Sequence, residues 1–170
     1  MTETRTLVAE YVTHNPGVHF NELVRSLDLA PGQVQHHIRR LIADDAIQRR
    51  EFYGRTHYFA PGFDAWERGV LALVRRDTAR AILGHVLEHG EARPGDVADE
   101  IGVARSTLEW HLDHLVERDI VHKRRDLHNH VTLELTHPER TAHLLESVSP
   151  SLPDPFVAQF DRRVSAVIEG

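Results

Sequence analysis

The chain has 170 residues, of which 41% are hydrophobic, and a formal net charge of −6 at pH 7. No apolar run approaches the ~20 residues that a membrane helix requires. The sequence contains no cysteine, which excludes disulfides, thiolate metal sites and thiol redox chemistry. The first residues, Met1-Thr-Glu-Thr-Arg, lack the charged and then apolar segments of a leader peptide. We therefore expect a soluble cytoplasmic protein that has no membrane segment.

The sequence predicts three helices in the N-terminal part of the chain, and the second and third of them form one structural unit. Residues 4–14 form the first, and residues 21–27 indicate a short amphipathic helix that breaks at Asp28. A further helix follows over residues 32–44, because apolar side chains recur there at the i, i+3, i+4, i+7 spacing of one buried face. That stripe consists of Val34, His37, Ile38 and Leu41. Two short helices across a tight turn constitute a helix-turn-helix unit.

A β-hairpin and two more helices come next. Residues 48–59 place β-forming side chains on either side of Gly54, which predicts a hairpin of the kind called a wing. Residues 63–76 carry enough apolar periodicity for a connecting helix, and residues 78–89 predict a counterpart of the helix at 4–14. No glycine- or serine-rich linker separates these segments, so we expect the two halves of the chain to pack through the connecting helix.

The second half of the chain repeats the apolar spacing of the first half at an offset of 74 residues, as the step from Leu23 to Val97 shows. The first set is Leu23, Leu27, Leu29, Val34, Ile38, Leu41 and Ile47, and its counterparts are Val97, Ile101, Val103, Leu108, Leu112, Leu115 and Val121. The pairs Ala30 and Ala104, His37 and His111, and Asp45 and Asp119 also fall in register. Such self-similarity indicates one supersecondary unit built twice. The sequence therefore predicts a second helix-turn-helix unit, with its break at Gly102.

A second hairpin and further helices complete the chain. Residues 122–135 contain a turn at 126–129 followed by alternating β-formers, which predicts a second wing. Residues 138–148 indicate a helix, and a proline-rich breaker separates it from a last amphipathic helix over residues 156–168. That last helix either docks onto its own domain or pairs two subunits.

These elements predict a mainly α fold with small β-hairpin wings, an α+β arrangement of two winged helix-turn-helix domains in tandem. We place the first domain at residues 1–62, the connecting helix at 63–76, the second domain at 77–137 and the C-terminal helices at 138–170. Dimerisation is one of the two roles that remain open for the last of these segments.

Three runs of residues carry a resemblance to a known family. They are Asn15-Pro-Gly-Val-His-Phe-Asn-Glu-Leu, Ala30-Pro-Gly-Gln-Val-Gln-His-His-Ile-Arg-Arg-Leu and Ala104-Arg-Ser-Thr-Leu-Glu-Trp-His-Leu-Asp-His-Leu. With them the chain resembles, over roughly residues 4–136, the winged helix-turn-helix regulators of the ArsR and MarR broad class, and specifically archaeal proteins with two such domains in tandem. The resemblance implies a transcriptional regulator that binds double-stranded DNA, and a homodimer would match the palindromic sites that such proteins bind. Because the chain has no cysteine, it cannot sense metals through thiolate ligands, as some members of the ArsR class do.

The net negative charge opposes binding to a polyanion, but the location of the charge matters more than its sum. Acidic residues are spread along the chain, whereas arginines gather on the second helix and the wing of the first copy. Lys123 is the only lysine, and this usage together with the acidic excess resembles that of proteins from salt-loving archaea. An acidic surface of that kind serves solubility, so the composition leaves DNA binding open.

The positions of the helix at 32–44 that do not belong to its apolar stripe form a polar face that points outward. Its outward residues are Gln33, Gln35, His36, Arg39 and Arg40. Glutamine can pair bidentately with adenine and arginine with guanine in the major groove of DNA. Three wing residues, Arg49, Arg50 and Arg55, are expected to contact phosphates or the minor groove. We assign primary DNA recognition to this first copy; the competing interpretation of the face is a solvated helix surface.

The equivalent helix of the second copy differs in charge. It opens with Arg105, Ser106 and Thr107. An acidic stripe then follows at Glu109, Asp113 and Glu117. Carboxylates at these positions would repel phosphates, although glutamate can accept a hydrogen bond from cytosine, so the helix either reads bases or forms a solvated or partner-facing surface. The second wing opens with Lys123, Arg124 and Arg125, for which we expect contacts to the DNA backbone.

Fourteen histidines raise the question of a metal site. Pairs at ligand spacing occur, such as His111 with His114 and His128 with His130, but each pair is weak by itself and we expect no metal. Phosphate-binding loops, serine-hydrolase elbows and zinc-protease motifs are absent from the sequence, so we expect neither a cofactor nor an enzyme. The competing function is a tandem winged-helix adaptor that binds protein, which the overall acidity and the acidic second helix favour.

Overall fold

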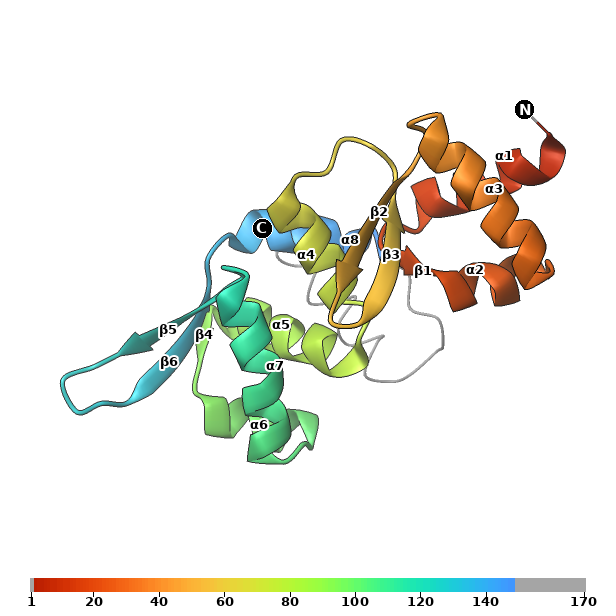
Figure 1. Ribbon diagram of the computed structural model, residues 1–170. Helices are drawn as coiled ribbons and strands as arrows, with labels where there is room; N and C mark the ends of the chain where they lie inside the picture. Colours follow the sequence, from red (N-terminus) through yellow and green to blue (C-terminus); the bar gives the residue numbers. More distant parts are fainter. Residues whose placement is uncertain (1, 149–170) are drawn as a thin grey trace. The chain divides into compact units, whose positions relative to one another are not determined.

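The computed structural model (Figure 1) describes residues 2–148 of the chain. These residues fall into two compact units, with the division between Ala72 and Leu73. The helix predicted over residues 156–168, and with it the dimerisation alternative, lies outside the described residues. None of the described helices combines the length and the apolar composition needed to cross a bilayer.

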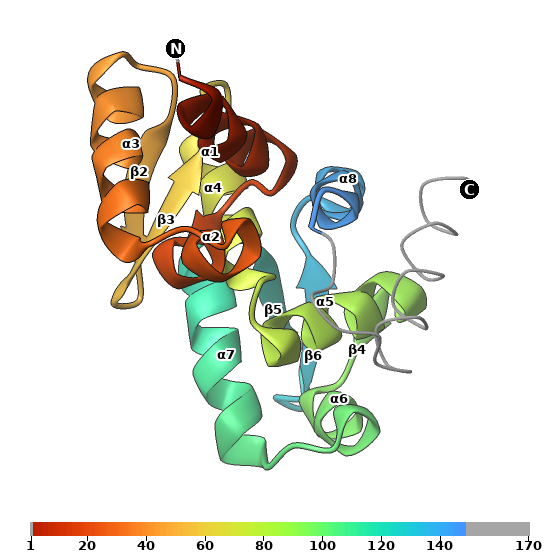
Figure 2. The same cartoon turned by 90° about the vertical axis from the view of Figure 1, so that its right-hand side faces the viewer.

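The first unit contains the elements predicted for the first copy, in the predicted order, together with a short additional strand, β1. They are α1 (Glu3–His14), β1 (Val18–His19), α2 (Phe20–Leu27), α3 (Pro31–Ala43), β2 (Gln48–Phe52) and β3 (Arg55–Phe59), followed by α4 (Ala65–Leu73), which contains the division between the units. Helices α1, α2 and α3 pack against one another, and the antiparallel sheet has the strand order β1-β3-β2 (Figures 1 and 2). The core of the unit consists of Val8, Val12, Val18, Leu23, Val34, Ile38, Leu41, Ile47 and Tyr58.

The second unit repeats this arrangement. Its elements are α5 (Asp77–His89), β4 (Glu91–Ala92), α6 (Pro94–Ile101), α7 (Arg105–Glu117), β5 (Val121–Arg125), β6 (Val131–Leu135) and α8 (Pro138–Glu146), and its sheet has the order β4-β6-β5. Helix α5 is the central helix, because every residue from Ala79 to Leu87 is buried. Residues 2–148 are thus mainly helical, with two three-stranded antiparallel sheets and two winged helix-turn-helix domains in tandem. The predicted fold class is confirmed.

Residues that fall in register between the two copies have the same structural role in each. Ala30 is the residue before α3 and Ala104 the residue before α7, with ψ of 142° and 149° at a common φ of −64°. Asp45 and Asp119 both adopt the left-handed conformation, at φ of 57° and 58°, in the turn that follows these helices. Aspartate tolerates this region better than most residues. Matched positions of the two copies therefore share their backbone conformation as well as their place in the hydrophobic core.

A matched exchange at the turn between the paired helices should change the stability of the two domains in opposite directions. The turn begins with Asp28 at φ 51° in the first domain and with Gly102 at φ 73° in the second. Glycine has no Cβ to clash in the left-handed region, so Asp28→Gly should raise the unfolding free energy by ~0.5–1 kcal/mol and Gly102→Asp should lower it by a similar amount. Urea denaturation of both variants measures the difference, and two changes of the same sign would contradict the expectation.

Each sheet contains a short third strand that the sequence analysis did not predict. Val18 and His19 pair with Tyr58 and His57, and Glu91 and Ala92 pair with Glu134 and Leu133. A two-residue strand is too short to show the alternation of side chains that identifies a strand in a sequence. Strand β4 matters for the candidate interface, because it places Glu91 beside the second wing.

Candidate nucleic-acid interface

Local chemistry fixes the start of α3. Pro31 occupies the first helical position, where its missing N–H removes no helical hydrogen bond. The side chain of Gln33 turns back, and its Oε1 accepts the backbone N–H of Ala30 at 3.2 Å. Gln33, which we predicted as a base-reading residue, therefore has its side-chain oxygen engaged in helix capping in this structure.

The remaining outward residues of α3 form an exposed polar face. Gln35, His36, Arg39 and Arg40 are all exposed, while Val34, Ile38 and Leu41 are buried on the opposite side. The His36 ring packs edge-on against the His37 ring, with centroids 5.3 Å apart. Within residues 2–148, Arg39 and Arg40 have neither a carboxylate partner nor a side-chain hydrogen bond.

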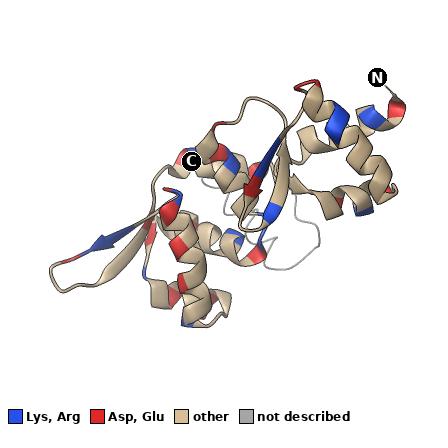
Figure 3. Cartoon of the chain, viewed as in Figure 1, with Lys and Arg blue, Asp and Glu red and all other residues tan. Residues whose placement is uncertain are grey.

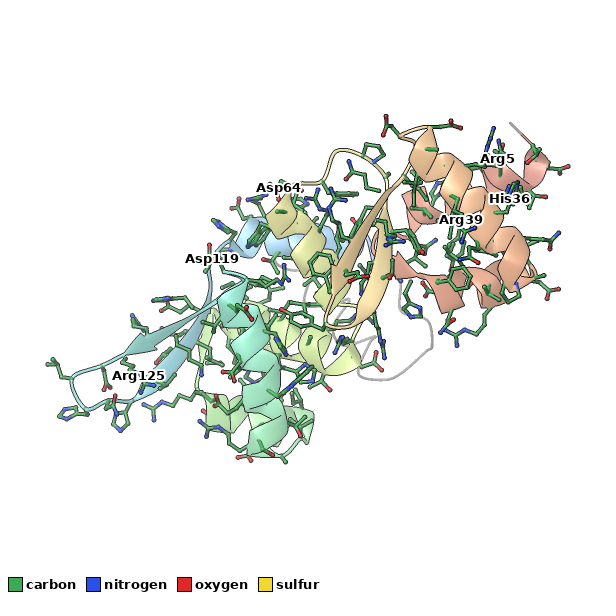
Figure 4. All side chains as sticks on the ribbon, viewed as in Figure 1. Arg5, His36, Arg39, Asp64, Asp119 and Arg125 are labelled. Carbon is green, nitrogen blue, oxygen red and sulfur yellow. The ribbon has the colours of Figure 1, made fainter. Side chains whose placement is uncertain are left out.

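One cation near this face was missed. Arg5 on α1 lies close enough to α3 for its charge to act on His37, and Figure 4 labels it beside His36 and Arg39. The sequence could not predict that Arg5 lies near the exposed face of α3, because this proximity depends on the packing of α1 against α3. Arg5 extends the positive charge beyond the predicted residues.

The first wing has a tight tip. Tyr53 and Gly54 have φ of 51° and 77°, and two consecutive positive φ values are those of a type I′ turn, which matches the twist of a hairpin. Arg50 pairs across the hairpin with His57, and Phe52 pairs with Arg55. Because side chains alternate along a strand, Arg50 and Arg55 lie on one face of the wing and Arg49 lies on the other. All three arginines are exposed.

In the second domain, basic residues are held by carboxylates. Glu109 on α7 binds Arg105 through Oε1, at 3.2 Å from Nε, and Lys123 on β5 through Oε2, at 3.0 Å from Nζ. Partial burial would raise the pKa of the Glu109 carboxyl, but the hydrogen bonds and charges of Lys123 and Arg105 outweigh it, so this pKa lies below its ordinary value. Glu109 is therefore ionised and neutralises two residues predicted to contact DNA.

Arg124 on the other face of β5 is held in the same way. Its Nη2 lies 2.7 Å from Glu91 and 3.2 Å from Glu134. Arg125 donates from Nη1 to the Asn129 side-chain oxygen at 3.0 Å. Strand alternation sends Lys123 and Arg124 to opposite faces of the hairpin, and a carboxylate is present on each face.

The two domains therefore differ in how their basic residues are paired with carboxylates; Figure 3 shows where the basic and acidic residues lie along the ribbon. Several arginines of the first domain have no carboxylate partner within the described residues, among them Arg25, Arg39, Arg40, Arg49, Arg50 and Arg55. A DNA phosphate can pair with these side chains directly, whereas in the second domain it has to compete with Glu91, Glu109 and Glu134. The first domain therefore carries arginines that are available to an anion, whereas the described basic residues Arg105, Lys123 and Arg124 of the second domain are paired with carboxylates.

Helix α7 exposes a tryptophan at its centre. Trp110 is 46% exposed. The His111 and His114 rings contact it edge-on, at centroid distances of 4.8 Å and 4.3 Å, and the Arg76 guanidinium lies 5.7 Å from its ring centroid. Ser106 and Thr107, which we predicted as DNA contacts, are exposed one turn earlier on the helix. A supported aromatic ring of this kind is typical of protein-binding surfaces.

The tip of the second wing is closed by Asp126. Its Oδ1 accepts the backbone N–H groups of His128 and His130 at 2.8 Å and 2.9 Å, and its Oδ2 lies 3.1 Å from Nδ1 of His130. The backbone hydrogen bond from His130 is the largest of several contacts that lower the pKa of this carboxyl. Across residues 2–148, no three His, Asp or Glu side chains are placed together so that they could hold a metal ion.

Acidification is expected to destabilise both domains through one pair of equivalent histidines. Burial lowers the pKa of His37 and of His111, and nearby positive charges lower both further, from His36 and Arg5 at His37 and from Arg76 and His114 at His111. Below the unfolded-state pKa of about 6.5 the unfolded chain binds more protons than the folded chain, so stability falls as the pH drops. The melting temperature should therefore decrease between about pH 7.5 and about pH 5.

The double variant His37→Gln/His111→Gln isolates this contribution. It should show a smaller decrease in melting temperature over the same pH range, measured by differential scanning calorimetry in a constant-ionic-strength buffer. The single variants His37→Gln and His111→Gln should each remove part of the decrease, since burial lowers the pKa of both histidines. A slope identical in all four proteins would assign the acid sensitivity to other groups.

Comparison with known proteins agrees with this architecture. A family model described as an N-terminal HTH domain matches residues 2–71, and one described as a helix-turn-helix domain matches residues 76–124. MJ1398 of Methanocaldococcus jannaschii, an HTH-type transcriptional regulator that is itself uncharacterized, is 24% identical over 126 residues, which cover 74% of this chain and 32% of that protein. The chain thus spans about a third of the length of this relative.

Solved structures with some similarity include two from bacteria. Reduced HlyU from Vibrio cholerae is 22% identical, with 48% of this chain and 84% of that chain covered and a TM-score of 0.42. The mRNA-binding domain of elongation factor SelB from E. coli, in complex with SECIS RNA, is 17% identical, with 79% and 98% covered and a TM-score of 0.31. From the two matched domains and the curated relative, the chain is a protein with two helix-turn-helix domains in tandem, distantly related to an archaeal HTH-type transcriptional regulator.

Proposed function

We propose that the chain is a sequence-specific DNA-binding regulator that occupies promoters through its first domain. Helix-turn-helix domains are typical of DNA-binding transcriptional regulators. The observation that carries the assignment to the first domain is the exposed face of α3, whose Arg39 and Arg40 have no carboxylate partner within residues 2–148. Such side chains are available to bases and phosphates without the loss of an internal ion pair.

Within this proposal the residues have separate tasks. Gln35, His36, Arg39 and Arg40 contact base edges in the major groove, while Arg49, Arg50 and Arg55 contact the backbone or the minor groove. Gln33 joins the reading set only if it leaves its capping position. The second domain supports binding weakly, through Arg105, Ser106, Thr107, Lys123, Arg124 and Arg125, and two copies pair on a palindromic site. The protein acts without a cofactor, in the cytoplasm of an archaeal cell.

Fluorescence anisotropy tests the proposal. The purified chain is titrated against genomic fragments that include its own promoter, from low to molar salt, beside a shuffled sequence of equal length. Specific binding that persists as salt rises supports sequence reading, because contacts to phosphates alone weaken steeply with salt. Equal affinity for the promoter and the shuffled fragment at every salt concentration would refute the proposed specificity.

A second candidate function is a protein-binding adaptor, and the surface of α7 favours it. Trp110 is exposed there, and two cations of α7 and β5, Arg105 and Lys123, are already paired with Glu109. Under this hypothesis the chain binds no DNA at any salt concentration, and Trp110→Ala removes its protein partner. Under the DNA hypothesis the same substitution leaves promoter affinity unchanged within about threefold, since a residue outside the contact surface contributes little.

A further inference from the structure

The first domain contains a hollow that no predicted site residue except Arg55 reaches. It has a volume of about 900 Å³ and lies between the start of α2, the start of α3 and the tip of the wing. The lining residues are His19, Phe20, Asn21, Val24, Arg25, Pro31, Gly54, Arg55 and Thr56. The volume is in the range of small-molecule sites, ~300–1,000 Å³. Helix α2 and β3 contact each other in this domain, so these lining groups share one concave surface.

The lining is positively charged. Arg25 and Arg55 line the hollow from two different elements, and none of the lining residues is acidic. Neither arginine has a hydrogen-bond or ion-pair partner in the part of the chain that the structure describes. Helices α2 and α3 both begin at this hollow, and the N-terminal ends of helices carry partial positive charge. The surface is therefore built to receive negative charge.

The same hollow has an apolar side. Phe20 and Val24 lie one turn apart on α2, and both are half-buried. Pro31 adds a third apolar side chain at the start of α3. Asn21 and Thr56 supply an amide and a hydroxyl group, so the lining combines apolar contact with a few polar groups, as ligand sites do.

We propose that this hollow binds a small organic anion. Its carboxylate or phosphate group would pair with Arg25 and Arg55, and its apolar or aromatic body would pack on Phe20 and Val24. The occupant lies between α3 and the wing tip, the two elements of the proposed DNA interface, so it competes with DNA and acts as an effector. That regulatory consequence rests on the proposed function, whereas the binding of the anion does not.

Calorimetric titration with defined probes tests the site in the absence of DNA. Phenyl phosphate joins a phosphate to an aromatic ring, inorganic phosphate lacks the ring, and benzamide lacks the charge. Phenyl phosphate should bind more tightly than either of the other probes. Arg25→Gln should weaken its binding about tenfold or more, because a charge-assisted hydrogen bond is lost, while Arg25→Lys should recover part of the affinity.

Arg93→Gln is the matched control, since it removes another exposed arginine that lies outside the hollow and outside the proposed DNA interface. It should leave phenyl phosphate affinity unchanged within about twofold. A competition assay then adds the DNA fragment, and phenyl phosphate should displace it from the wild-type chain. Circular dichroism confirms that each variant is folded.

The outcomes separate the anion site from the proposed function. Binding of phenyl phosphate that depends on Arg25, in a chain that binds no DNA, supports the anion site and refutes the DNA proposal. DNA binding without any binding of phenyl phosphate overturns the anion site, and the hollow then only borders the DNA backbone. Equal affinity of the wild-type and Arg25→Gln chains for phenyl phosphate also overturns it.

Discussion

Replacement of Arg39 and Arg40 together by alanine should weaken promoter binding by about thirtyfold or more, because each arginine contact to a base or a phosphate is worth ~1–3 kcal/mol. Both side chains lie on the exposed face of α3, and neither has an internal ion pair in residues 2–148. The substitution therefore leaves no buried charge behind, and the unfolding free energy should stay within ~0.5 kcal/mol of the wild-type value. Anisotropy titration at one fixed salt concentration measures the affinity, and urea denaturation checks the fold.

The double variant Arg105→Ala/Arg124→Ala is the matched control, since it removes the same amount of positive charge from the second domain. Both residues are engaged with glutamates, so their loss should weaken DNA binding by less than about threefold. Equal losses in the two double variants would mean that the chain binds DNA through its overall positive charge. A small loss in the Arg39 and Arg40 variant would move the interface away from α3.

Much of the fold could be predicted from the sequence because its determinants are local. The stripe at Val34, Ile38 and Leu41 and its counterpart at Leu108, Leu112 and Leu115 are buried as predicted. The predicted break at Asp28 is present, and its backbone is left-handed. Histidines at equivalent positions of α3 and α7 are half-buried at the edge of each stripe, which explains why an otherwise polar residue recurs in the core pattern. Periodicity and turn chemistry are properties of neighbouring residues, and a single sequence contains them.

The charge state of the site could not be predicted because its determinants are distant in sequence. Glu91 reaches Arg124 only because β4 pairs with β6, and Glu109 reaches Lys123 only because α7 packs against β5. From the sequence alone, we expected Lys123 and Arg124 to be available cations and Glu109 to repel phosphate. In the structure these charges neutralise one another. A list of charged residues therefore overstates how strongly the second wing can attract phosphate.

Two leucines at equivalent positions allow the contribution of each domain to be measured. Leu41 and Leu115 are both fully buried, and replacement of either by alanine should cost ~2–5 kcal/mol of unfolding free energy. A domain of this size has only a few kcal/mol of stability, roughly 0.05–0.15 kcal/mol per residue, so the affected domain should be largely unfolded. Leu41→Ala should therefore abolish promoter binding, whereas Leu115→Ala should leave the promoter affinity within about threefold of the wild-type value.

The two tryptophans report on the domains separately, because Trp66 lies in the first unit and Trp110 in the second. In a Trp110→Phe background the fluorescence of Trp66 follows the first domain, and in a Trp66→Phe background that of Trp110 follows the second. If Leu115→Ala unfolds only the domain of Trp110 and DNA binding survives, the first domain is sufficient for recognition. If Leu115→Ala abolishes binding while the signal of Trp66 stays native, the second domain takes part in reading DNA, and the assignment of recognition to α3 alone is wrong. If either leucine variant unfolds both tryptophan environments together, the two helix-turn-helix units form one cooperative structure, and the anisotropy of the charge variants becomes the deciding measurement.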